Sequence, residues 1–195
     1  MATSRENKTL SQFKSTLLGG GARPNLFEVE LTTLPSGITW DAESFRYLCK
    51  AAALPASNIA QIDVPFRGRI FKVAGDRTFD VWQITVINDE DFKIRTAFEE
   101  WMNQISKLDN NLGATDPSAY MTNATVYQLG RGQQKASTSN DGSSNSVLKE
   151  YEFVDIFPTA ISAIDLSYDT SDAIEEFTVD FQVQSFNMVS GGPNG

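Results

Sequence analysis

The sequence has no histidine and only one cysteine, Cys49, among its 195 residues. Without histidine there can be no Ser-His-Asp or Cys-His catalysis, and no zinc or iron site that needs an imidazole ligand. One cysteine cannot form an intrachain disulfide, and it leaves too few soft ligands for a structural zinc ion. We therefore expect no catalytic residues, no metal and no cofactor, and a fold held by burial and by partners.

Long apolar runs and basic residues are also scarce. No window approaches the roughly 18 apolar residues of a membrane span, and Met1 to Lys8 lack the apolar centre of a signal peptide. We therefore expect the protein in a cytoplasm, or in a particle assembled there.

The 16 Lys and Arg residues stand against 25 Asp and Glu residues, a net charge of −9. This balance argues against wrapping a phosphate backbone, but an acidic wall suits a channel through which DNA passes.

The order of patterns predicts one mainly β domain over residues 23–189, a sandwich or barrel with one flanking helix. Residues 1–22 are expected to form an extended N-terminal arm and residues 190–195 a flexible tail. Residues 130–146 carry almost no apolar side chains, which predicts a mobile polar loop inserted in the domain. Apolar and polar residues alternate in the predicted strands, at residues 27–31, 45–54, 62–66, 69–73, 79–87, 121–129, 147–157, 164–168 and 177–184.

Two helices are predicted. In the arm, Thr9 is a candidate cap for a short helix, and a disordered leader is the alternative. The longer helix is predicted to begin at Asn88, a good N-cap followed by three acidic residues that favour the helix dipole. One apolar stripe marks its inner face as a lid over the β core, with a coiled-coil seam as the lesser alternative. The stripe consists of Ile94, Phe98, Trp101, Ile105 and Leu108.

Charge is divided unevenly along the chain. A basic cluster lies among apolar residues between positions 66 and 79, whereas residues 161–189 contain six acidic residues and no basic one. The basic cluster is compatible with a nucleic-acid patch, but opposed surfaces on one chain favour head-to-tail self-association. The acidic cluster lacks the spacing of a calcium loop, and a solvated or lumen-facing surface is the simpler interpretation than an acid/base pair. The predicted subunit or ring interface comprises Arg67, Arg69, Lys72, Asp76 and Arg77.

Several stretches of the chain form a recognisable pattern, at residues 23–29, 50–55, 73–90, 157–159, 164–168 and 174–179. Taken together, they resemble the tail tube proteins of T4-like contractile-tailed phages. The resemblance runs in order through most of the chain, and its most specific part is the segment from Val73 to Glu90. The longer arm before Arg23 and the polar insertion at residues 132–145 depart from the pattern.

This resemblance implies a structural virion protein and not an enzyme. It implies hexameric rings that stack into a tube inside a contractile sheath, with a tape measure protein and then DNA in the lumen. Baseplate and tail terminator proteins would bind the ends, and assembly would take place in the host cytoplasm. The tube of a type VI secretion or other contractile injection system is the near alternative. Periodicity alone would also allow a β-sandwich binding module, and a hydrolase is less favoured still.

The C-terminal strands suggest which residues would face the lumen. Alternation places polar side chains on one face, and we expect Asp165, Asp180 and Gln182 to line the bore. The opposite face would fill the core, and an outer-wall position for the carboxylates is the alternative. The expected core residues are Leu166, Val179, Phe181 and Val183.

Overall fold

A computed structural model describes residues 10–17, 21–110, 112–130, 147–169 and 172–189. The predictions for residues 1–9, 131–146 and 190–195 lie outside these described residues. The helical elements in the described ranges are α1 (Leu10–Thr16), α2 (Ala42–Leu48), α3 (Lys93–Ile105) and the 3-10 turn η2 (Pro117–Ala119). The strands are β1 (Phe27–Glu30), β2 (Cys49–Ala52), β3 (Ser57–Phe66), β4 (Arg69–Phe79), β5 (Trp82–Ile87), β6 (Thr122–Leu129), β7 (Val147–Ile161), β8 (Glu176–Gln182) and β9 (Ser185–Val189).

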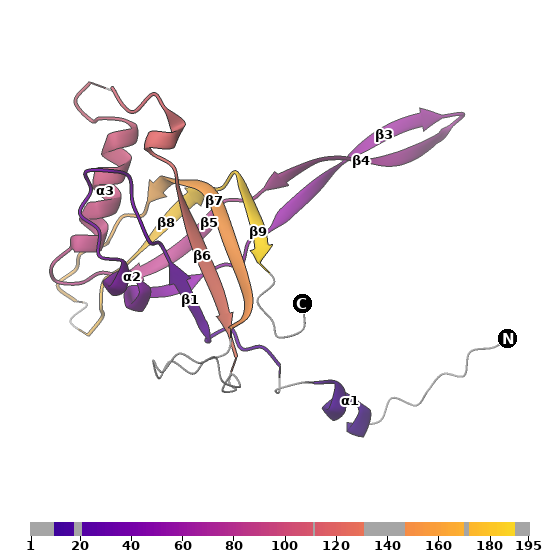
Figure 1. The fold of residues 1–195 in the computed structure, drawn as a ribbon, viewed down its shortest axis with the longest axis horizontal. Helices are drawn as coiled ribbons and strands as arrows, with labels where there is room; N and C mark the ends of the chain where they lie inside the picture. Colours follow the sequence, from indigo (N-terminus) through magenta and orange to yellow (C-terminus); the bar gives the residue numbers. More distant parts are fainter. Residues whose placement is uncertain (1–9, 18–20, 111, 131–146, 170–171, 190–195) are drawn as a thin grey trace.

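The long strand β7 belongs to both halves of the main sheet (Figure 1). Residues 147–156 pair with β6 and β9, whereas residues 157–161 pair with β8. Near this junction Asp155 has a left-handed backbone (φ 54°), and the register shifts between Phe153 and Ile156 against β6 and between Pro158 and Ala160 against β8. A bulge of this kind bends a strand around a corner. The halves β1-β6-β7-β9 and β7-β8-β5-β2 thus enclose one core, which confirms the predicted barrel-like sandwich.

The core is dominated by aromatic side chains. Trp82 of β5 stacks on Phe153 with ring centroids 4.3 Å apart, and Phe181 of β8 contacts Trp82, Phe98 and Trp101. The Trp82 indole donates a hydrogen bond to the Ala53 carbonyl at 2.9 Å, so its polar atom is satisfied inside the core. The prediction that Val179, Phe181 and Val183 are buried is confirmed.

Helix α3 covers the core as predicted, but its start lies elsewhere. Ile94, Phe98 and Trp101 are buried, whereas Leu108 lies beyond the helix and is exposed. The N-cap residue is Phe92 and not Asn88. Asn88 instead ties the end of β5 to the residue before β8: its amide nitrogens donate to the carbonyl and the carboxylate of Glu175.

The predicted strand at residues 45–54 is wrong in its first half. Helix α2 occupies residues 42–48, and only Cys49–Ala52 form a strand. The helix starts there because Asp41 is an N-cap whose carboxylate accepts from the Ser44 amide at 3.1 Å and the Ser44 hydroxyl at 2.7 Å. Phe45 then points into the core from the inner face of the helix.

Two further differences concern the C-terminal region. The predicted strand at residues 164–168 is absent from the described residues, and Leu166 is exposed and not part of the core. An alternating pattern alone is not enough, because a strand needs a neighbour to satisfy its backbone. Strand β9 was missed. After β8 the chain turns at Val183 and follows the bend of β7, which brings β9 beside residues 150–154.

We expect the Asp41 cap to make the subunit acid-sensitive. Hydrogen bonds to the Asp41 carboxylate, first from the Ser44 hydroxyl and then from the Ser44 backbone amide, lower the pKa of Asp41 below its usual value of 3.8. Because the folded-state pKa is depressed, the stabilisation is present above pH 3.8 and is lost as the pH falls through the lowered value. D41A should lower the melting temperature at pH 7, whereas D41N should retain most of the cap. Equal melting temperatures for D41A and the parent at pH 7 would contradict this role.

Candidate subunit interface

Strands β3 and β4 form a two-stranded ribbon that projects away from the sandwich (Figure 1). Its tip is the two-residue turn Arg67–Gly68, where both residues have positive φ angles of 46° and 81°. Positive φ at both central positions is typical of a type I′ turn, whose twist matches that of the flanking strands. Neither half of the main sheet pairs with the ribbon.

Cross-strand register divides the outer ribbon into two different faces. Residues opposite one another in an antiparallel pair lie on the same side, and Val64 faces Phe71 while Asp63 faces Lys72. The first side is apolar, and its five aliphatic and aromatic side chains are between 41% and 66% exposed. We call this side the apolar ribbon face; it comprises Ile62, Val64, Phe66, Phe71 and Val73.

A β-bulge separates this outer part from the base of the ribbon. Gly75 and Asp76 of β4 together lie opposite Ala60 of β3, and the register shifts there. A Cβ atom on Gly75 would be 3.0 Å from the Ala60 carbonyl oxygen. Glycine therefore permits the close approach of the two strands at the bulge, which increases the local twist.

The base of the ribbon is attached to the sandwich by a few specific contacts. Phe79 packs edge-to-face on Phe186 of β9 with ring centroids 5.3 Å apart. The Asn58 amide donates to the Asp80 carboxylate at 2.8 Å. Both contacts are at the base of the ribbon. Among the described residues, the side chains of the apolar ribbon face are not part of the buried core of the sandwich.

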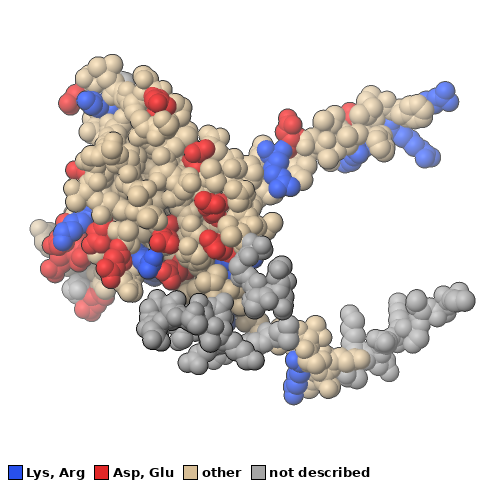
Figure 2. Space-filling model, in the orientation of Figure 1, with Lys and Arg blue, Asp and Glu red and all other residues tan. Residues whose placement is uncertain are grey.

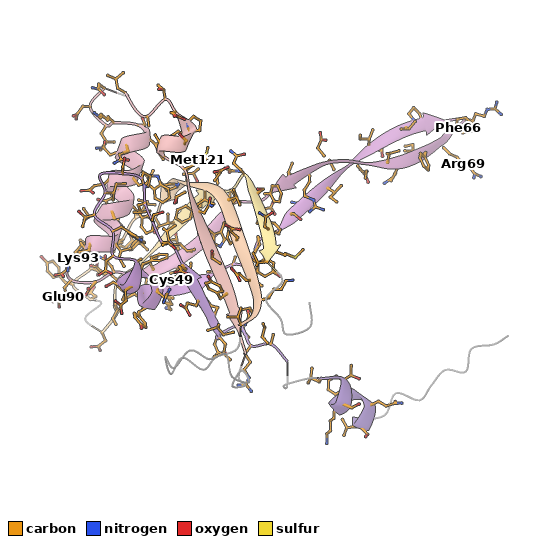
Figure 3. All side chains as sticks on the ribbon, in the orientation of Figure 1. Cys49, Phe66, Arg69, Glu90, Lys93 and Met121 are labelled. Atoms are coloured by element: carbon orange, nitrogen blue, oxygen red, sulfur yellow. The ribbon has the colours of Figure 1, made fainter. Side chains whose placement is uncertain are left out.

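The structure places all five predicted interface residues on this ribbon, but not on one side of it. Arg69 is opposite Phe66 on the apolar ribbon face, whereas Lys72 is on the other side and donates to Gln61 at 3.2 Å. Arg67 lies at the turn, and Asp76 and Arg77 lie at and just after the bulge. Figure 3 shows Phe66 and Arg69 together at the tip.

The interface predicted from the sequence did not include the apolar ribbon face. The alternation of Ile62, Val64 and Phe66 predicted a strand correctly, but a period of two is the same whether the apolar side faces its own core or another copy. The available signal was a pair of adjacent amphipathic strands that are joined by only two residues, Arg67 and Gly68.

Acidic side chains gather at the opposite end of the molecule, over α2 and the start of α3 (Figure 2). Glu43 of α2 is exposed, as are Asp89, Glu90 and Asp91 in the connection just before α3, and Figure 3 marks Glu90 far from the ribbon tip. Basic residues nearby are already paired with carboxylates, which leaves the surplus negative charge uncompensated. The pairs are Arg46 with Glu28 and Glu30, Lys50 with Glu176, Lys93 with Asp91, and Arg95 with Glu99.

The predicted lumen residues do not all lie together. Asp180 and Gln182 share the side of β8 that faces away from the core, and the Gln83 amide of β5 donates to the Asp180 carboxylate at 2.7 Å. Asp165 lies in the connection between β7 and β8, so the alternation argument does not apply to it. We call the polar side of β5 and β8 the outer strand face; it comprises Gln83, Thr85, Thr178, Asp180 and Gln182.

The described residues offer little reactive chemistry. They contain no group of three or more His, Cys, Asp or Glu side chains that could hold a metal ion. Burial raises the pKa of the Cys49 thiol to about 12, so it stays protonated at neutral pH and is a poor nucleophile. None of the helices in the described ranges is long and apolar enough to cross a membrane.

Comparisons with known proteins agree with this architecture. The tail tube protein gp19 of Enterobacteria phage T4 is 35% identical over 161 residues, which cover 83% of this chain and 88% of that protein. A chain of the anti-feeding prophage baseplate superposes with a TM-score of 0.60 at 12% identity, covering 87% of this chain and 95% of its own. A chain from the sheath/tube terminator of the PVC extracellular contractile injection system gives 0.58 at 13% identity, covering 87% and 97%. The profile of the phage tail tube protein family matches residues 22–189, so the chain belongs to this family and is a structural protein of the phage tail, not an enzyme.

Proposed function

We propose that six copies of this chain form a ring and that rings stack into the tube of a contractile phage tail. The apolar ribbon face carries this proposal. A two-stranded ribbon on its own is marginally stable in water, and contiguous exposed apolar side chains mark an interaction surface. In a protein of the tail tube family, the partner that covers this face is another copy of the same chain.

Energetics favour the apolar side chains over the basic ones as the main source of affinity. Burying a Val or Phe side chain contributes about 1.5–3 kcal/mol. An exposed ion pair contributes about 0–1 kcal/mol, and salt screens it. The basic residues at the ribbon tip and the acidic side chains around α2 and the start of α3 therefore orient the subunits head to tail. The apolar ribbon face contributes most of the binding free energy.

The number of copies and the partners rest on the relatives. The anti-feeding prophage baseplate was reconstructed with sixfold symmetry, which supports a hexameric ring here. The identity of 35% to a T4 protein favours a phage tail over an injection system. A sheath outside, a tape measure protein inside, and baseplate and terminator proteins at the ends complete the proposed particle, assembled in the host cytoplasm.

Assembly can be tested with the purified chain alone. We expect long hollow tubes of constant width under negative-stain electron microscopy, and a rapidly sedimenting species in the ultracentrifuge. A chain that remains monomeric over a range of concentrations and salt would contradict self-assembly without a template.

We further propose that the outer strand face lines the bore. Its side chains are polar, and Asp180 contributes one negative charge per subunit, repeated around each ring. Such a wall repels the phosphates of DNA and lets the genome slide without adhering. Asp165 stays a candidate for the lumen only if its connecting segment also reaches the bore.

A lysine on the outer strand face should make the bore retain DNA. We expect Q182K tubes to bind a short single-stranded oligonucleotide more tightly than parent tubes at low salt, as measured by fluorescence anisotropy. The difference should vanish at about 1 M salt, where screening acts over about 3 Å. The same substitution in a chain that cannot assemble is the control, because an isolated lysine binds weakly. Equal binding by Q182K and parent tubes at low salt would place Gln182 outside the bore.

A further inference from the structure

Helix α1 presents an apolar face that no other described part of the subunit buries. Leu10 and Phe13 of the helix and Leu17 just after it follow one another at helical spacing, and each is between 45% and 69% exposed. No residue of α1 is buried, and Figure 1 shows the helix apart from the sandwich. A helix of seven residues is marginal in water unless a partner packs on it. The helix also precedes residue 22, where the match to the family begins.

The arm that carries α1 differs in charge from the rest of the chain. Residues 1–22 contain three basic residues, Arg5, Lys8 and Lys14, and one acidic residue. The remaining residues contain 13 basic and 24 acidic ones. An amphipathic, basic segment is attracted to an apolar surface with acidic surroundings.

The connection between β7 and β8 is such a surface. Leu166, Tyr168 and Ile174 are its most exposed apolar side chains, and they line a hollow of about 810 Å³ together with Ile164. The charged residues of the connection itself are all acidic, namely Asp165, Asp169, Asp172 and Glu175. Two basic residues border it, Arg95 at the Ser162 carbonyl and Lys50 paired with Glu176. A rival exposed apolar pair, Leu108 and Leu112, has Lys107 beside it and a weaker acidic surplus. We call the described residues 163–169 and 172–175 the acidic dock.

In Figure 1 the acidic dock lies at the lower left of the sandwich and α1 at the lower right, well apart from each other. Two different patches of one subunit can meet when copies associate head to tail. We propose that α1 of one copy binds the acidic dock of a neighbouring copy, with Leu10, Phe13 and Leu17 over Leu166, Tyr168 and Ile174. This proposed contact rests on the proposed tube, and it would be a second interface between neighbouring copies beside the one at the apolar ribbon face.

Disulfide trapping in the full-length chain tests the contact. Residues in contact can be bridged when replaced by cysteine, since a disulfide needs Cα atoms within about 7 Å. We expect F13C/Y168C tubes to give covalent dimers and higher species after mild oxidation. The matched control is F13C/L108C, which places the second cysteine on a different exposed residue. Proximity in the tube should favour the first pair by about tenfold or more. The native Cys49 is buried and does not compete.

The outcomes separate the two proposals. Normal tubes in which F13C/Y168C cross-links no more than F13C/L108C would overturn the docking contact and leave the tube intact. A disulfide within one copy, visible as a monomer of altered mobility, would also overturn it, as would a cross-link to the sheath protein in whole particles. Absence of tubes from the parent chain would remove the proposed function, and the docking contact with it. L10S/F13S tubes should dissociate at lower denaturant than parent tubes, and unchanged dissociation would count against the docking contact.

Discussion

We expect no tubes to form when Val64 and Phe71 are both replaced by serine, while the subunit stays folded. The two side chains face each other on the apolar ribbon face and are 43% and 65% exposed in the single subunit. Their removal costs the subunit core nothing, because they do not belong to it. In the assembly it removes about 3 kcal/mol or more from each contact. The association constant therefore falls at least about a hundredfold per contact.

The matched control lies on the other side of the same ribbon. D63S/K72S changes the neighbouring cross-strand pair and removes one charge of each sign, so the net charge is preserved. We expect D63S/K72S to assemble nearly normally, and V64S/F71S to remain monomeric with an unchanged melting temperature. Sedimentation velocity and electron microscopy measure both. Normal tubes from V64S/F71S would show that the apolar ribbon face is not an interface.

The second large effect concerns the core rather than the interface. F181A should destabilise the subunit by about 3–5 kcal/mol, because it opens a cavity at the centre of the aromatic cluster. Phe181 is fully buried, and its ring contacts Trp82, Phe98 and Trp101. For a domain of this size the melting temperature should fall by about 10 °C or more.

F71A provides the control for this prediction, because the same Phe→Ala substitution then removes an exposed ring instead of a buried one. Assembly raises apparent stability by mass action, so both variants are compared in an I62S/V73S background that keeps the chain monomeric. F71A should leave the melting temperature within about 2 °C of the parent, since exposed substitutions change stability little. Similar losses for F181A and F71A would mean that the ribbon packs on its own domain.

Sequence patterns predicted the regular parts of the sandwich well. Residues 177–184 alternate strictly because β8 has a core on one side and a polar surface on the other, and the burial follows that alternation. The stripe of α3 was equally clear, since Ile94, Phe98 and Trp101 face the aromatic cluster. Where one side of an element is buried in its own domain, the period of the pattern is enough.

The errors arose where local signals compete with tertiary contacts. Asn88 is a good N-cap in isolation, but its side chain donates a hydrogen bond to the Glu175 carboxylate. The helix therefore begins five residues later, at Lys93. Residues 45–54 are apolar enough for a strand, yet the Asp41 cap favours a helix for the first half. The alternation at residues 164–168 has no neighbouring strand to pair with, so these residues form a connection instead.

The interface residues named from the sequence remain a prediction. All five lie on the ribbon, because clustered charges between strands are visible in the sequence. Their division between two sides could not be predicted without the register, which depends on the turn at Arg67–Gly68 and on the bulge at Gly75. The role of the apolar side chains could not be predicted either, because the pattern does not say which molecule they pack on.

A three-dimensional reconstruction of tubes grown from the purified chain tests the central claim most directly. The quantity to compare is the exposed area of Ile62, Val64, Phe66, Phe71 and Val73 in the tube and in the single subunit. We predict that a neighbouring copy covers all five side chains, and that Asp180 and Gln182 face the bore. A tube in which these five side chains stay in solvent, or a preparation that contains no tube at all, would contradict the account.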